Sequence, residues 1–137
     1  MTLEYMDLVR AAQAARARAY APYSRFQVGA AALSASGRVF PGCNIENAAY
    51  PATVCAERVA LFSAYAAGEH AITTLAIVTD TPDPASPCGT CRQVIRELAP
   101  DCTVVLANMR GDVYITTPDA LLPGAFTSQE LRAGRNE

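Results

Sequence analysis

The order of apolar segments along the chain is the feature that most constrains its fold. Short apolar or alternating runs predict strands at 26–33, 37–45, 75–80, 103–108 and 112–117. Stretches with helical spacing predict helices at 3–19, 54–67 and 88–98, and Pro118 begins a short final helix. Strands linked through a helix run parallel, and the first two strands are expected to pair antiparallel. The sequence therefore predicts an α/β fold, a three-layer α-β-α sandwich around a mixed sheet of about five strands.

Length and composition place few other demands on the chain. Its 137 residues, 51% hydrophobic and 18% charged, predict a single domain over 1–137, with a flexible tail after about 128 and a frayed "RAGRNE" end. No apolar run is long enough for a membrane span and no leader opens the chain, so we expect a cytoplasmic protein. A net charge of -2 with scattered arginines argues against a nucleic-acid partner and favours a small molecule.

Three cysteines lie at the starts of two predicted helices. Cys88 and Cys91 form a C-x-x-C pair, which by itself serves redox exchange or metal binding. Cys55 supplies a third thiol near the start of the other helix, where the helix dipole favours a negative sulfur. Thr53 and Ser86 are the expected helix caps. Three protein ligands with no obvious fourth are typical of a catalytic zinc, which keeps one position for water.

The remaining metal-ligand types in the sequence are weaker candidates. His70 follows Gly68 in a predicted loop and is a possible fourth ligand, although a lone loop histidine seldom binds metal. Cys43 and Cys102 lie in or beside predicted strands, where a thiol more often packs as a small apolar side chain.

Two charged residues follow Cys55 directly. Glu57 is placed so that its carboxylate lies near a metal without binding it, as a proton shuttle requires. Arg58 is positioned to donate to the thiolates and offset their negative charge. The alternatives are a glutamate stabilised by the helix dipole and a solvated arginine.

Four motifs in one order resemble the small homotetrameric cytidine deaminases. They are "PYSRFQVGAA" at 22–31, "CNIENAAY" at 43–50, "CAE" at 55–57 and "PCGTC" at 87–91, and the resemblance extends from about 21 to 126. The three-cysteine ligand set with a glutamate that is not a ligand is a known variant of the zinc-deaminase signature. The resemblance implies a homotetramer with one zinc per subunit.

The resemblance also implies the activity. Zinc-dependent hydrolysis would convert cytidine and deoxycytidine to uridine and deoxyuridine with release of ammonia, as in pyrimidine salvage. Cys55, Cys88 and Cys91 would hold the zinc, which activates water for attack at C4 of the ring. Glu57 would act as base and then as acid.

Further residues take roles in substrate binding by the same resemblance. Asn44 and Glu46, expected on one face of a strand, would bind the ribose 3′-hydroxyl, and Phe26 would pack on the pyrimidine. The backbone N–H of Ala56 would contact the base carbonyl. Residues expected to complete a neighbouring subunit's site are Ala48, Tyr50 and Phe126.

Three other functions fit parts of the pattern. A deaminase of another cytosine-bearing small molecule, such as blasticidin S, shares the zinc motifs, but Asn44 and Glu46 favour a nucleoside. A polynucleotide deaminase usually has histidine as its first ligand and needs a basic surface. A non-enzymatic module stapled by zinc would give Glu57 no role.

Overall fold

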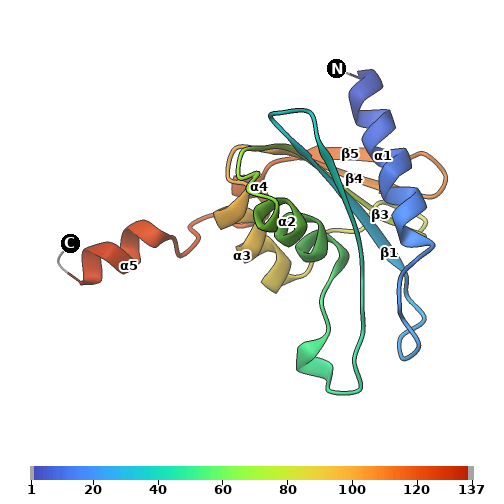
Figure 1. The fold of residues 1–137 in the computed structure, drawn as a ribbon, viewed down its shortest axis with the longest axis horizontal. Helices are drawn as coiled ribbons and strands as arrows, with labels where there is room; N and C mark the ends of the chain where they lie inside the picture. Colours follow the sequence, from blue (N-terminus) through green and yellow to red (C-terminus); the bar gives the residue numbers. More distant parts are fainter. Residues whose placement is uncertain (1, 136–137) are drawn as a thin grey trace.

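A five-stranded mixed sheet forms the centre of the protein (Figure 1). The computed structural model describes residues 2–135, and side chains from residue 5 onward. The strands are β1 (Val28–Ser34), β2 (Val39–Cys43), β3 (Ile72–Thr79), β4 (Thr103–Asn108) and β5 (Val113–Thr116), in the spatial order β2-β1-β3-β4-β5. Only β3 and β4, which are joined through a helix, pair in parallel among the described strands. The predicted antiparallel first pair is confirmed.

Helices cover both faces of this sheet. They are α1 (Thr2–Arg16), α2 (Ala56–Ala66), α3 (Gly89–Leu98), α4 (Pro118–Leu121) and α5 (Ser128–Gly134), with a short 3-10 turn η1 (Tyr50–Ala52). Helix α1 lies on one face, and α2 and α3 lie side by side on the other (Figure 1). The predicted three-layer α-β-α architecture is therefore confirmed.

Side chains that alternate between the two faces of the sheet divide the hydrophobic core into two halves. Ala31 of β1 packs with α1, whereas its neighbours Ala30 and Ala32 pack with α2. Successive side chains of a strand point to opposite faces, so one short strand serves both layers. Two glycines let the helices approach the sheet closely. A Cβ at Gly29 would meet the Ala12 carbonyl oxygen of α1 at 1.9 Å, and one at Gly42 would meet that of Ala56 in α2 at 2.5 Å.

Several segment boundaries differ from the sequence prediction, among them the following three. Helix α1 ends at Arg16 rather than at 19, because Tyr20 forms a parallel bridge with Ile45. Strand β2 stops at Cys43, so Asn44 and Glu46 follow the strand instead of lying on it. Helix α5 occupies part of the segment expected to fray. Thr127 and Glu130 form a capping box that the composition of the tail did not reveal.

Two segments project from the body. Helix α5 extends outward beyond α3, and the chain between β2 and α2 forms a long arm that contains η1 (Figure 1). Ile45 and Val54 form an antiparallel bridge across the base of this arm. None of the described helices has the length and apolar character needed to cross a membrane.

Candidate active site

Helices α2 and α3 begin side by side, and each begins at a cysteine. Cys55 is the N-cap of α2 and Cys88 the N-cap of α3, both with extended backbone. Cys91 lies buried in the first turn of α3. The predicted caps are wrong: Thr53 accepts a hydrogen bond from the Asn47 N–H in the arm instead. A cysteine therefore occupies the cap position of each helix, although neither thiol forms a capping hydrogen bond.

The three sulfurs form a group that fits a zinc ion. All three lie within 4.8 Å of one another, and Cys55 Sγ is 4.0 Å from Cys88 Sγ. In a tetrahedral site with Zn–S bonds of about 2.3 Å, two sulfurs lie about 3.8 Å apart. Thiolates are soft donors that suit zinc, so both the spacing and the chemistry of the donors match this metal.

The guanidinium of Arg58 lies against the sulfurs, as the charge argument predicted. Arg58 Nη2 is 3.4 Å from Cys55 Sγ. A hydrogen bond from the Cys91 thiol, assisted by Arg58, lowers the pKa of Cys55 to about 5. The hydrogen bond to Cys55 and burial raise the pKa of Cys91. Cys55 thus ionises more readily than Cys91, its hydrogen-bond partner.

Glu57 lies in the first turn of α2 and is almost fully buried, with 4% of its surface exposed. Burial is the main cause that raises the pKa of its carboxyl above the ordinary value, and the charge of Cys55 acts in the same direction. Its carboxyl lines the cavity that Cys55 and Cys88 also line. A carboxyl with a raised pKa beside a metal site is suited to accept a proton and return it.

A cavity of about 320 Å³ opens in front of the sulfurs. The loop before β1, the base of the arm, the starts of α2 and α3 and the end of β3 contribute its lining: Ser24, Phe26, Val28, Asn44, Glu46, Thr53, Cys55, Glu57, Ile77, Thr79, Ala85, Ser86, Pro87 and Cys88. This volume lies within the range that small-molecule sites occupy. The structure therefore brings two predicted metal ligands, the predicted shuttle and three predicted substrate residues into the lining of one cavity, with the third ligand, Cys91, buried beside the other two sulfurs.

Asn44 and Phe26 are coupled through the backbone. The Asn44 amide donates to the Phe26 carbonyl at 2.8 Å, and its oxygen accepts from the Val28 N–H at 2.8 Å. The Phe26 side chain remains 44% exposed at the cavity wall. Asn44 thus fixes the loop that presents Phe26, in addition to lining the cavity itself. Ala56 is fully buried as the first residue of α2, where an N–H has no acceptor within the helix.

Glu46 is held by the loop before β1. One carboxylate oxygen accepts from the N–H groups of Tyr23 and Ser24 at 3.0 and 3.1 Å, and the other accepts from the Ser24 hydroxyl. The Ser24 hydroxyl is the main cause that lowers the pKa of Glu46 below its ordinary value. A fixed, ionised carboxylate at the cavity mouth can accept a hydrogen bond from a hydroxyl group of a ligand.

Sequence reasoning missed two parts of the site. Ser24 stands within the motif at 22–31 but received no role, because its partner Glu46 is 22 residues away. Thr79 and the loop at 85–87 were missed although a signal existed. Thr79 ends a strand that was predicted, and ligand sites in α/β folds gather at the carboxyl ends of strands.

The weaker ligand candidates lie apart from the three sulfurs. His70 stacks on the Tyr65 ring with centroids 4.2 Å apart, and it is not a member of the sulfur group. Cys102 is buried, and burial raises the pKa of its thiol to about 12, as expected for a cysteine that packs as an apolar side chain. Cys43 is half-buried at the end of β2.

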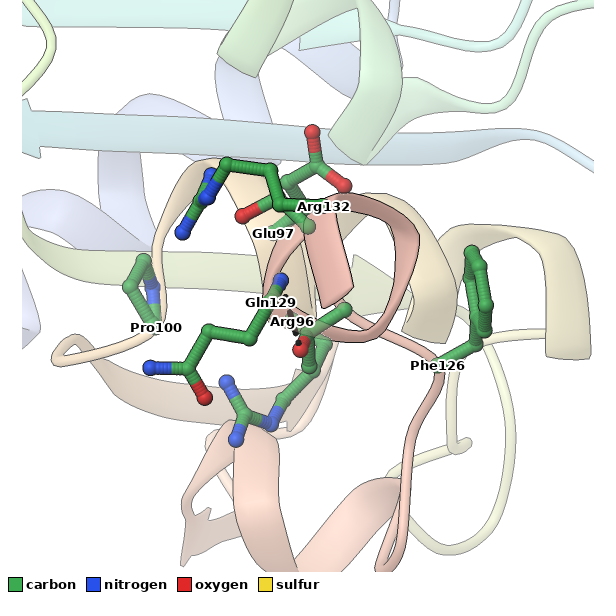
Figure 2. Close-up of a pocket in the computed structure, with 8 residues that line it drawn as sticks. Arg96, Glu97, Pro100, Phe126, Gln129 and Arg132 are labelled. Atoms are coloured by element: carbon green, nitrogen blue, oxygen red, sulfur yellow. Dashed lines mark hydrogen bonds between the residues drawn. The ribbon is translucent and has the colours of Figure 1, made fainter. Parts of the chain in front are cut away.

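The three residues predicted to serve a neighbouring subunit are exposed. Tyr50 is 73% exposed on the arm, where its ring meets Tyr23 edge-on, and Ala48 is exposed in the same arm. Phe126 is 60% exposed and lines a separate cavity beneath α5, together with Arg96 and Gln129 (Figure 2). Phe126 therefore does not line the sulfur cavity of its own chain.

Known proteins are similar to this chain in sequence and in fold. The family model for the cytidine and deoxycytidylate deaminase zinc-binding region matches residues 3–107. Cytidine deaminase from Halalkalibacterium halodurans is 53% identical over 125 residues, which cover 90% of this chain and 95% of that protein. The enzyme from Sporosarcina psychrophila is 50% identical, over 94% of this chain and 96% of that protein.

Solved structures and a more distant relative agree with this result. A crystal structure of cytidine deaminase from Burkholderia pseudomallei superposes with a TM-score of 0.86 and is 54% identical, covering 88% of this chain and 98% of that chain. Blasticidin-S deaminase from Bacillus cereus is 36% identical, over 76% of this chain and 79% of that protein. The chain belongs to the cytidine and deoxycytidylate deaminase zinc-binding family, as its four motifs predicted.

Proposed function

We propose that this protein is a zinc-dependent enzyme that hydrolyses cytidine and deoxycytidine to uridine and deoxyuridine, with release of ammonia. The observation that supports this proposal best is the buried Glu57 beside three clustered sulfurs in a cavity of small-molecule size. Cys55, Cys88 and Cys91 would hold the zinc, which would supply Lewis-acid chemistry that lowers the pKa of water to about 7. The Arg58 guanidinium limits the negative charge that the three thiolates place on this centre.

Glu57 carries out the proton transfers of the reaction. Its carboxylate takes a proton from the attacking water and delivers it to N3 of the pyrimidine, so that C4 accepts the oxygen. It then takes the second proton of that water and passes it to the leaving amine. One buried group can do both because burial raises the pKa of its carboxyl, which makes it a better proton acceptor while it remains an acid.

The remaining cavity residues fix the nucleoside. Asn44 and the ionised Glu46 bind the ribose 3′-hydroxyl, Phe26 covers the pyrimidine ring, and the Ala56 N–H donates to the base carbonyl. These polar groups at the cavity mouth favour a ribose-bearing substrate over blasticidin S. Two of them are positioned before substrate arrives, since Glu46 and Asn44 are both held by hydrogen bonds to the loop before β1.

The proposal extends to assembly and cellular role. The single five-stranded sheet supports one domain over 1–137, and the exposed Tyr50 and Phe126 support a homotetramer in which neighbouring subunits complete each site. Ala48, beside Tyr50 on the arm, belongs to the same contact. We place the protein in the cytoplasm, in pyrimidine salvage, with one zinc per subunit.

The test is zinc content together with the ultraviolet absorbance change on adding cytidine, for the parent protein and for Glu57→Gln. Glutamine keeps the size of the side chain but cannot shuttle a proton. We expect one zinc per chain in both proteins, and activity lower by at least about 100-fold in Glu57→Gln.

Two results would contradict the proposal. Full activity of Glu57→Gln would show that Glu57 is not the proton shuttle, and the zinc would then have only a structural role. If the parent protein turned over blasticidin S but not cytidine or deoxycytidine, the proposed deamination chemistry would still hold but the proposed substrate would be wrong.

A further inference from the structure

Arg92 of helix α3 joins the zinc-site loop to a distant part of the chain. Its Nε donates to the Pro87 carbonyl at 2.8 Å, and its Nη1 donates to the Leu121 carbonyl at 2.8 Å. The side chain is partly buried between these two groups. One guanidinium therefore spans from the segment before Cys88 to the end of helix α4.

A hydrogen bond to the Pro87 carbonyl restricts the position of the Cys88 backbone. The peptide bond that contains this carbonyl also contains the Cys88 nitrogen, and its atoms form one rigid plane that ends at the Cys88 Cα. Fixing the oxygen therefore fixes the position of the Cys88 Cα, and the start of helix α3 at Cys88 sets the remaining backbone angles from which its side chain leaves. Cys88 needs such support because its thiol is exposed, unlike that of the buried Cys91.

The loop between β3 and α3 is also held in its first part, where Asp80 pairs with Arg16 of α1 at 3.9 Å. Residues 80–88 contain no helix or strand. The fully buried Asn108 donates to the Pro82 carbonyl at 3.0 Å and holds the first part of the loop. Arg92 holds its last part, directly before the ligand.

The second acceptor of Arg92, the Leu121 carbonyl, belongs to helix α4, which is itself held in place by a cap and by buried side chains. Helix α4 is capped by Thr117, whose side chain accepts from the Ala120 N–H at 3.1 Å, and its Pro118 and Leu121 are buried. A guanidinium is planar and offers donors in fixed directions, so it can hold two carbonyls at a set separation. The loop is thus tied to a part of the fold that does not belong to the cavity.

We propose that Arg92 is a positioning residue for the zinc site, which holds the Cys88 peptide in the orientation that lets its sulfur join those of Cys55 and Cys91. Residues that orient metal ligands typically change metal affinity or activity by about 10- to 100-fold when they are removed. A purely structural role, tying α4 to α3, would instead lower stability and leave zinc binding unchanged.

Arg96 provides a matched control on the same helix. It lies one turn after Arg92, and its Nε pairs with Asp119 of α4 at 2.9 Å. It therefore links the same two helices through an arginine, but its ion pair is not with the loop before Cys88. Any effect that comes only from loosening α4 will be present in variants of both arginines.

The experiment measures the rate at which zinc leaves the zinc-loaded protein to a chromogenic chelator in excess, with thermal unfolding recorded in parallel. For Arg92→Met we expect zinc release at least about 10-fold faster than in the parent, and for Arg96→Met release within about 2-fold of the parent. Equal release from Arg92→Met and the parent would overturn the proposal. So would equal acceleration in both variants, because it would trace the effect to α4.

A second pair of variants keeps the test valid if Arg92→Met does not fold. Lysine retains the charge and much of the length of arginine, but one ammonium cannot hold two separated carbonyls in fixed directions. We expect Arg92→Lys to release zinc faster than Arg96→Lys, at a rate between those of the parent and Arg92→Met where the latter folds. Equal rates in the two lysine variants would contradict a positioning role.

Discussion

At the scale of single residues, Glu46 shows how the site prepares a carboxylate before any substrate binds. Ser24 contributes both its N–H and its hydroxyl to this carboxylate, and Tyr23 adds a second N–H. The hydroxyl is the largest cause that lowers the pKa of Glu46. Ser24 should therefore affect substrate binding without touching the reacting atoms.

Ser24→Ala tests this role. The Ser24 hydroxyl donates to Glu46 and accepts from the Phe26 N–H at 3.0 Å, so the substitution removes two hydrogen bonds. It raises the pKa of Glu46 toward its ordinary value and leaves the carboxylate less well fixed. We expect KM for cytidine to rise about 2- to 10-fold at pH 7, with kcat within about 2-fold, as for the loss of such hydrogen bonds. Because a protonated carboxyl is a poorer acceptor, KM should rise further as the pH falls toward 5. Steady-state kinetics across this pH range provide the measurement.

Ser36 offers the matched control for this prediction. Its hydroxyl donates to the carboxylate of Glu69 at 2.8 Å, in the turn between β1 and β2 and outside the cavity. Ser36→Ala should leave KM unchanged at every pH. A similar rise in both variants would show that the effect of Ser24 is not specific to Glu46.

The sequence predicts the thiol group well and its surroundings less well. Cys88 and Cys91 are three residues apart, and Cys55 and Glu57 are two apart, so local spacing identifies them. The contact between Ser24 and Glu46 joins two loops that only the folded chain brings together. Residue type alone does not distinguish such a serine from one in any polar loop.

At the scale of elements, the placement of helix α2 decides where Cys55 and Glu57 lie. The sequence predicts the helix but assigns its cap to Thr53, because threonine is a preferred cap and cysteine is not. In the structure Cys55 is the cap. The start of the helix is set by packing on strand β2, where Gly42 faces the backbone of Ala56 and Ala60. Local preference could not show this contact.

Gly42→Ala should displace the start of α2. A Cβ there would lie 2.5 Å from the Ala56 carbonyl oxygen and 2.6 Å from the Ala60 nitrogen, and neither is a flexible side chain. We expect a loss of about 1–3 kcal/mol of unfolding free energy, as for other overpacked sites. Urea unfolding of the zinc-loaded protein provides the measurement.

Gly134 supplies the comparison, because a Cβ there meets nothing within 4 Å. Gly134→Ala should retain the stability of the parent. Unchanged stability of Gly42→Ala would show that α2 can shift away from β2 without cost.

At the scale of the whole molecule, the order of strands and helices was predictable, whereas the projecting parts were not. Periodicity reports which segments bury an apolar face within the chain. It says little about the segment that leads into α5 and about the arm with η1, whose large apolar side chains Phe126 and Tyr50 are exposed in the single chain. Their role becomes clear only if a second subunit covers them, which is the basis of the proposed tetramer.

Mixing two inactive or impaired variants tests whether Phe126 serves a neighbouring site. Phe126→Ala should lower kcat/KM for cytidine about 5- to 100-fold, the effect of losing one base–aromatic stacking contact. Glu57→Gln subunits lack the shuttle but retain Phe126.

When both chains are produced together and assemble at random, a Phe126→Ala subunit that has a Glu57→Gln neighbour regains a complete site. We therefore expect kcat/KM per Phe126→Ala chain to rise to about half of the parent value in an equal mixture, measured after light scattering confirms assembly. If Phe126 acted only within its own chain, no mixture could exceed the activity of its Phe126→Ala component alone, and the proposed contribution across subunits would be wrong.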